Sequence, residues 1–300
     1  MSNQTSSSNQ LPIPWFSSGF THTVYVLSIT SFILNLTVCV LLYRNKRKRQ
    51  SFNGVLTQYY LLSTVYALYH IAGNIVKHTV DSYHWRIYEL FHTSVIWALC
   101  HFQINLLLLM AIQRYVAVCY PVKARYLLTS GKTRFQILLS HTVVALYYTL
   151  FAVVGYFEEL SWFNSMFDFA NAVMSIQIMV NVVIYLVIFY KMRRSTPDFD
   201  RGTTSTTTNA GAINATAATR NQENIKKSSL FCLLLALTYA IGSFPIFLGL
   251  MFDIDWIMVF GSVLVWIDVL FAAVWYICLM SDFQCCKKKT SNKNDNLQLK

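Results

Sequence analysis

Charged side chains are rare inside the long apolar stretches of this 300-residue sequence, so each one there is a candidate for chemistry. Asp268 is the one acid deep within such a stretch. An acid in an apolar interior is costly and normally has a partner there. Asp268 is therefore either a structural aspartate held by hydrogen bonds or part of a functional cluster. We predict an interior cluster of four polar residues at similar depth: Asn35, Ser63, Gln103 and Asp268.

The histidines and lysines argue against two other kinds of chemistry. The seven histidines scatter along the chain without a ligand-type repeat such as His-x-x-x-His. They are His22, His70, His78, His84, His92, His101 and His141. Residues 256–280 contain no lysine that could hold retinal as a Schiff base. We therefore expect no enzyme activity, no bound metal and no cofactor.

The elements that position these residues follow from composition. Hydrophobic residues make up 55% of the chain and charged residues 12%, about half the charged share of an average soluble protein. A hydrocarbon core about 30 Å thick needs roughly 20 helical residues to cross it. The sequence predicts an all-α membrane protein, a bundle over 22–284. Its seven expected spans are 22–43, 54–76, 89–113, 134–156, 167–190, 229–252 and 256–280.

The basic residues predict the orientation of these spans. All of the 24 Lys and Arg residues except Lys77 and Arg86 fall on one side of the predicted bundle. Basic loops stay in the cytoplasm, so we expect residues 1–21 to be extracellular, with a glycosylation sequon at Asn3. Anionic membrane lipids on the cytoplasmic side account for the net charge of +11 without any nucleic acid partner.

Two cytoplasmic segments have distinctive compositions. Residues 191–228 have no apolar period and are expected to form a disordered loop. Cys285 and Cys286 begin the basic tail 285–300 and are followed by three lysines, a pattern typical of palmitoylation. The alternative for this pair is two reduced cytosolic thiols.

The most informative motif is Gln113-Arg114-Tyr115, at the cytoplasmic end of the third predicted span, with Pro121 six residues after the tyrosine. It resembles the Asp/Glu-Arg-Tyr motif of class A (rhodopsin-like) G-protein-coupled receptors. In that family the acid holds the arginine at rest, and activation frees the arginine to meet the G protein. Gln113 can hydrogen-bond Arg114 but cannot form an ion pair, which implies a weaker clamp. The alternative is an interfacial arginine whose side chain snorkels to water.

Further positions resemble the same family. Asn35 fits its first-helix asparagine, Pro245 the proline that kinks the sixth helix, and Tyr276 the seventh-helix tyrosine. Other signatures are absent, since Ser243 and Glu89 replace the usual tryptophan and cysteine.

Over residues 22–284 the chain looks like the nematode serpentine chemoreceptors, with the Srg superfamily as the nearest resemblance. This implies a chemosensory receptor in the plasma membrane of sensory-neuron cilia that couples to a heterotrimeric G protein. The loop 191–228 is then a candidate contact for arrestin or a kinase.

A ligand pocket, if the chain has one, should open outward between the third, fifth, sixth and seventh spans. Helix packing is the alternative reading for each aromatic residue there. The expected lining is largely aromatic and suits a small apolar or weakly polar molecule. The candidate lining residues are Trp97, Cys100, His101, Gln177, Phe244, Phe247 and Trp266.

A second class of function stays open at this stage. A seven-span membrane protein without G-protein coupling, transporter-like or scaffold-like, would keep the same topology. Internal repeats, broken helices and rings of charge, which are typical of transporters and channels, are not found in the sequence.

Overall fold

The structure is a computed structural model that describes residues 18–44, 51–77, 82–157, 160–194, 209–252 and 254–280. All regular elements in these ranges are helices, which confirms the predicted all-α class for the described part of the chain. The helices are α1 (Ser18–Arg44), α2 (Ser51–Lys77), α3 (Ser82–Cys119), α4 (Pro121–Leu127), α5 (Ser130–Tyr156), α6 (Leu160–Arg194), α8 (Asn209–Phe252) and α9 (Asp255–Met280).

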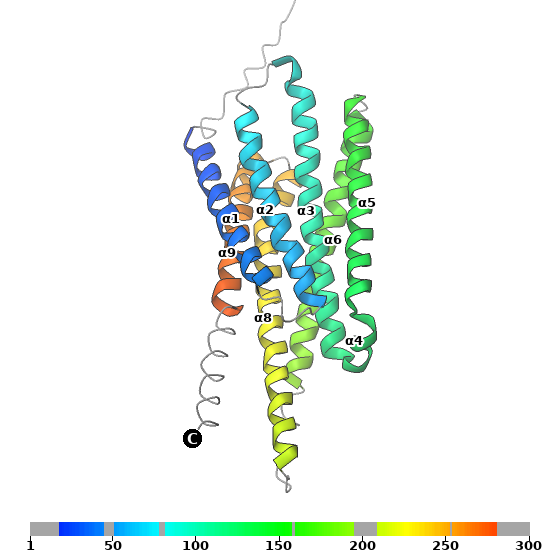
Figure 1. Cartoon of the computed structure of the whole chain (residues 1–300). Coiled ribbons are helices and arrows are strands. Elements are labelled where there is room, and N and C mark those ends of the chain that lie inside the picture. Colours follow the sequence, from blue (N-terminus) through cyan, green and yellow to red (C-terminus); the bar gives the residue numbers. More distant parts are fainter. Residues whose placement is uncertain are drawn as a thin grey trace, which may run out of the picture.

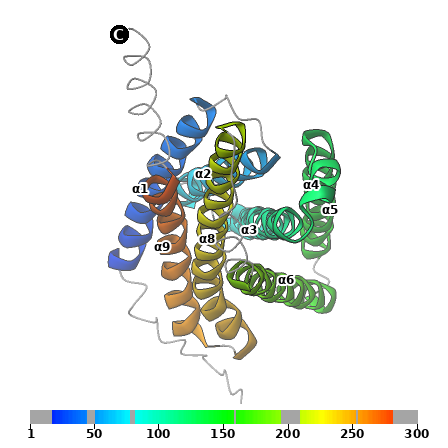
Figure 2. The same cartoon turned by 90° about the horizontal axis from the view of Figure 1, so that it is seen from below.

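The long helices lie side by side in one bundle, and the short α4 joins α3 to α5 at one end, called here the α4 end (Figure 1). Seen along the bundle, α3 occupies the middle, with α2, α8, α6 and α5 around it (Figure 2). Helices α1 and α9 lie together on one side, and α5 lies on the opposite side.

Six of the helices are long and apolar enough to cross a membrane. These segments are His22–Arg44, Ile87–Cys119, Ser130–Tyr156, Ser165–Arg193, Lys227–Ile246 and Phe260–Cys278. The remaining predicted span, 54–76, lies within α2, which has sufficient length at 27 residues but is not among the six helices that are apolar enough. The reason is that α2 carries buried tyrosines and hydroxyl residues, among them Tyr59, Tyr60 and Ser63.

The outer surface of the bundle is apolar. On α5, the side chains of Phe135, Leu138, Leu146 and Leu150 are all more than half exposed. Water would penalise such a face, whereas lipid tails accommodate it. This pattern agrees with a multi-pass membrane protein.

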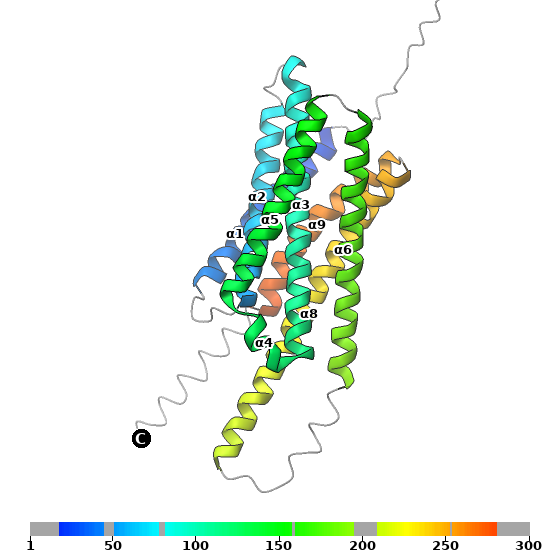
Figure 3. The ribbon, with the colours of Figure 1, turned by 90° about the vertical axis from the view of Figure 1, so that its right-hand side faces the viewer.

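One prediction about the loop 191–228 is wrong in part. Residues 191–194 continue α6, and residues 209–228 form the first half of the 44-residue helix α8, which extends past the bundle at the α4 end (Figure 3). This segment holds several alanines, the best helix formers, and extending an existing apolar helix avoids the cost of nucleation. Residues 195–208 lie outside the described part.

Helices α8 and α9 approach each other closely on both sides of Pro245, which lies inside α8 as predicted. A Cβ atom added to Gly242 would meet the carbonyl oxygen of Leu264 at 3.2 Å. A Cβ atom added to Gly261 would meet the backbone nitrogen of Ile246 at 2.7 Å. Small residues of this kind let membrane helices pack backbone to backbone.

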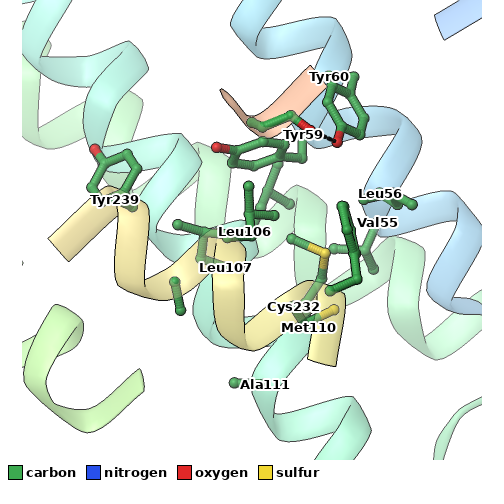
Figure 4. Close-up of a cluster of buried hydrophobic side chains, with 14 of the residues drawn as sticks. Val55, Leu56, Tyr59, Tyr60, Leu106, Leu107, Met110, Ala111, Cys232 and Tyr239 are labelled. Atoms are coloured by element: carbon green, nitrogen blue, oxygen red, sulfur yellow. Dashed lines mark hydrogen bonds between the residues drawn. The ribbon is translucent and has the colours of Figure 1, made fainter. Parts of the chain in front are cut away.

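The largest group of buried side chains lies between α2, α3, α8 and α9 (Figure 4). Figure 4 shows Tyr59 and Tyr60 of α2 beside Leu106 and Leu107 of α3, with Tyr239 of α8 nearby. The Tyr60 hydroxyl donates a hydrogen bond to the carbonyl of Ala272 at 2.7 Å and so joins α2 to α9. This core holds the helices that carry the predicted site residues in place.

Candidate functional site

Arg114 lies near the α4 end of α3 and is enclosed by neighbouring helices. Its guanidinium carbon lies 3.5 Å from the centroid of the Phe52 ring at the start of α2. Tyr185 of α6 and Cys232 of α8 interact with the same guanidinium. The Nε atom is buried and has no hydrogen-bond partner. We call these four residues the arginine site; its guanidinium packs on a ring face, and the residue as a whole is half-buried.

Gln113 is buried and points to a different helix. Its Nε2 donates a hydrogen bond to Oγ1 of Thr133, the fourth residue of α5, at 3.2 Å. Consecutive residues of a helix point about 100° apart, so Gln113 faces α5 while Arg114 faces α2 and α8. The expectation that the Gln113 amide bonds Arg114 is therefore replaced by a bond to α5.

The two predicted tyrosines occupy different surroundings. Tyr115 makes an edge contact with Tyr120, with ring centroids 6.0 Å apart. Tyr276 is buried between α2 and α8, where its ring makes edge contacts with Tyr60 at 5.6 Å and Phe231 at 6.2 Å. Phe231 directly precedes a member of the arginine site, so α8 connects Tyr276 to that site.

The predicted polar cluster is brought together in the bundle interior. Asn35, Ser63, Gln103 and Asp268 are each no more than 3% exposed. Gln103 Nε2 donates to Ser63 Oγ at 3.3 Å and so links α3 to α2. Asn35 Nδ2 donates to the carbonyl of Val269 at 3.4 Å and so links α1 to α9 beside Asp268. We call these four residues the polar core.

Asp268 is surrounded by hydroxyl groups. Its side chain hydrogen-bonds that of Thr238, and the rings of Tyr59 and Tyr239 lie within electrostatic reach. Its Oδ1 atom is buried and has no hydrogen-bond partner. Tyr59 belongs to the same helix as Ser63, so α2 links Asp268 to the hydrogen-bonded pair of Ser63 and Gln103.

The predicted pocket residues separate into two groups. Trp97 and His101 face α5 and α6, since Trp97 lies edge-on to Phe167 at 5.2 Å and His101 edge-on to Tyr148 at 6.0 Å. His101 also interacts with Gln177 of α6. Gln177 Nε2 in turn donates to Asn105 Oδ1 at 3.0 Å.

Cys100 and Trp266 lie on the other side of α3. Trp266 is buried against Tyr66 of α2, with ring centroids 5.2 Å apart, and Cys100 packs against the same cluster. Phe244 is 60% exposed, so the prediction that it lines the interior is wrong. It follows the inward-facing Ser243 and is turned about 100° away from it. The side chain of Phe247 lies outside the described residues.

The structure adds polar residues that the sequence analysis missed. Asn105 lies four residues after His101 on α3, and Asn181 lies four residues after Gln177 on α6. We call these four residues the polar stripe. The stripe and the neighbouring Tyr148 have four buried atoms without a hydrogen-bond partner: His101 Nδ1, Tyr148 OH, Gln177 Oε1 and Asn181 Oδ1. The spacing of four on two helices was a signal that could have found them.

Unpartnered polar atoms inside a bundle attract water or a polar ligand, because leaving them empty is costly. On α3, Asn105 and His101 precede Arg114 by nine and thirteen residues, so the polar stripe lies about 14–20 Å along the helix from Arg114. The polar stripe therefore offers unpartnered hydrogen-bonding groups at a distance from the α4 end.

Three predicted modification sites, Asn3, Cys285 and Cys286, lie outside the described residues. Among the described cysteines, Cys39, Cys100, Cys119, Cys232 and Cys278 are free thiols. Over the same ranges the structure groups no three His, Cys, Asp or Glu residues as a metal site. No model of a known protein family matches the chain, and no curated protein is significantly similar to it.

Proposed function

We propose that this protein is a seven-span receptor that binds a small molecule at the polar stripe and activates a heterotrimeric G protein at the α4 end. In this proposal α2 also crosses the membrane, which brings the number of spans from six to seven. Its polar side chains face other helices rather than lipid, and its neighbours α1 and α3 both carry segments that can cross a membrane. An odd number of spans and the basic loops then place the N-terminus outside.

The observation that carries the proposal is the enclosure of Arg114. An arginine among Phe52, Tyr185 and Cys232 is held by a ring face and weak hydrogen-bond partners rather than by an acid. Such contacts are lost when α2, α6 or α8 shifts, which would free the guanidinium at the α4 end. Contacts that are lost in this way suit a resting state of the receptor that ends when a ligand binds.

The ligand class follows from the polar stripe and its aromatic neighbours. The unpartnered oxygens of Gln177 and Asn181 require hydrogen-bond donors, while Trp97 and Tyr148 offer ring surfaces. An uncharged, weakly polar molecule with at least one hydroxyl or N–H group meets both requirements. The resemblance of the chain to nematode chemoreceptors supports a sensory role in the plasma membrane of cilia.

The test of coupling compares two arginines. Arg114→Ala should abolish G-protein activation in a heterologous cell, both basal and evoked by any molecule found in a ligand screen. The matched control is Arg134→Ala on α5, because Arg134 is exposed and distant in sequence from the motif. Surface labelling of both variants must match the parent protein.

If Arg114→Ala signals as the parent does, coupling through this arginine is excluded. The alternative, a seven-span membrane protein without G-protein coupling, then becomes the better reading. The Asn214-Ala215-Thr216 sequon tests the orientation separately, since glycosylation at Asn214 would place that segment outside the cell.

A further inference from the structure

Two histidines that are far apart in the sequence meet between α2 and α3, at the end of the bundle opposite α4. The ring centroids of His70 and His92 lie 6.1 Å apart. His70 Nε2 and His92 Nδ1 are both buried and lack hydrogen-bond partners. A buried imidazole nitrogen without a partner is unusual and calls for an explanation.

Aromatic neighbours hold both rings in place. His92 is stacked between Tyr69 and Tyr88, with centroid distances of 5.0 and 5.3 Å. His70 makes edge contacts with Tyr66 and Trp266, both at 4.9 Å. These ring contacts hold both imidazoles in place, while His70 Nε2 and His92 Nδ1 have no hydrogen-bond partner.

Gly73 shows where the nitrogens of His92 point. A Cβ atom added to Gly73 would lie 2.2 Å from Cε1 of His92, 2.9 Å from its Nε2 and 3.0 Å from its Nδ1. The edge of the ring that carries both nitrogens therefore faces α2 at Gly73. His70 lies three residues earlier on α2, on the same side of that helix.

The separation of the two rings suits a shared metal ion. Zinc binds imidazole nitrogen at about 2.1 Å with tetrahedral geometry, which places the centroids of two imidazoles on one ion about 5.3 Å apart. The observed separation of 6.1 Å is within about 1 Å of this value. Glu89 is exposed on α3 and lies three residues before His92, so it adds negative charge to the same face of the helix.

We propose that His70 and His92 form a binding site for a divalent transition-metal ion, with Zn²⁺ as the probe, between α2 and α3. Two imidazoles hold the ion, water completes its coordination, and Glu89 supplies nearby negative charge. By joining the two helices, the ion stabilises the end of the bundle away from α4. The site does not depend on the proposed coupling to a G protein.

The experiment titrates zinc chloride into the full-length protein, purified in detergent through an affinity tag without histidine. Calorimetry measures the stoichiometry, and thermal unfolding measures Tm. We expect one saturable site per chain and a rise in Tm with zinc. His70→Phe and His92→Phe keep an aromatic ring at each position and should abolish both effects. The matched control is His141→Phe, a histidine stacked on Phe102 between α5 and α3.

Gly73→Ala tests the geometry while both histidines remain. Its methyl group must displace the His92 ring, so zinc affinity should fall at least about tenfold. Glu89→Gln, at an exposed position, should weaken binding by a smaller factor. If one of the two phenylalanine variants fails to fold, zinc binding by the other variant and by Gly73→Ala tests the proposal.

The proposal is overturned if the parent protein has no saturable zinc site. It is also overturned if either phenylalanine variant binds zinc as tightly as the parent, because the ion is then held elsewhere in the chain. Neither result bears on the role of Arg114, which is measured by G-protein activation.

Discussion

Arg114 and Asp268 are both ionisable side chains enclosed by the bundle, yet their surroundings differ in kind. Arg114 lies at the α4 end against the face of one ring and beside a thiol. Asp268 lies in the middle of the bundle, with the hydroxyl of Thr238 as its partner and two tyrosine rings nearby.

This difference means that the contacts of Arg114 can be broken by a movement of the helices, whereas those of Asp268 cannot. A cation over a ring near the end of a bundle can reach water once the helices part. An acid in the centre has no such route and depends on fixed hydrogen bonds from α8 and the electrostatic influence of α2. We therefore expect changes at the arginine site to alter signalling, and changes in the polar core to alter stability as well.

Among changes to the surroundings of Arg114, the largest expected effect on signalling is that of Phe52→Ala. A desolvated cation–π contact stabilises by about 1–2 kcal/mol, so its loss should shift the equilibrium between resting and active states about 5- to 30-fold toward the active state. Basal G-protein activation measures this shift. Phe135→Ala, on the exposed face of α5, is the control. Unchanged basal activity in Phe52→Ala would mean that the ring does not restrain Arg114.

Asp268→Asn replaces a side chain that can ionise with a neutral one of the same shape. A hydrogen bond to an ionised group exceeds a neutral one by about 1 kcal/mol, so basal activity or its dependence on sodium should change about fivefold. The matched control is Asp168→Asn, an exposed acid of α6. If neither quantity moves, Asp268 has a purely structural role.

Ser63→Ala breaks the hydrogen bond that Gln103 donates from α3 to α2. The buried amide then lacks this partner, which should cost about 1 kcal/mol of stability and lower the Tm in detergent. Thr149→Ala provides a comparison, since the Thr149 hydroxyl is exposed and bonds only within α5. Equal Tm values for both variants would show that the polar core contributes little.

The smallest effect is expected for Thr133→Val, which removes the acceptor of the Gln113 amide. Since Gln113 faces α5 rather than Arg114, basal signalling should change less than about twofold. A rise as large as that of Phe52→Ala would show that Gln113 restrains the arginine through a contact absent from this structure.

Much of the polar core could be predicted from the sequence. All four residues are polar and lie in the middle of apolar stretches: Asn35, Ser63, Gln103 and Asp268. Exposing such side chains to lipid is costly, so they face the interior of the bundle. Their burial therefore follows from composition and depth. The partners of Asp268 could not be predicted in this way, because Thr238 and Tyr239 are ordinary residues of another helix.

The pocket was predicted less well because helix rotation decides it. Cys100 and His101 are adjacent in the sequence, yet Cys100 packs toward α2 and His101 toward α5 and α6. Phe244 is predicted to line the pocket, yet it is 60% exposed, and the neighbouring Ser243 occupies the inward face. A single sequence carries little information on which face of a uniformly apolar helix points inward.

The sequence by itself determined that this chain is helical, apolar and suited to a membrane, because length and hydrophobicity act on each segment separately. It also located Gln113-Arg114-Tyr115 at the end of a helix. Only the tertiary structure decided that Arg114 packs on Phe52, that Gln113 bonds Thr133, and that His70 meets His92. Contacts between helices depend on rotation and close approach, as at Gly73 and Gly242, and these are properties of the packed bundle.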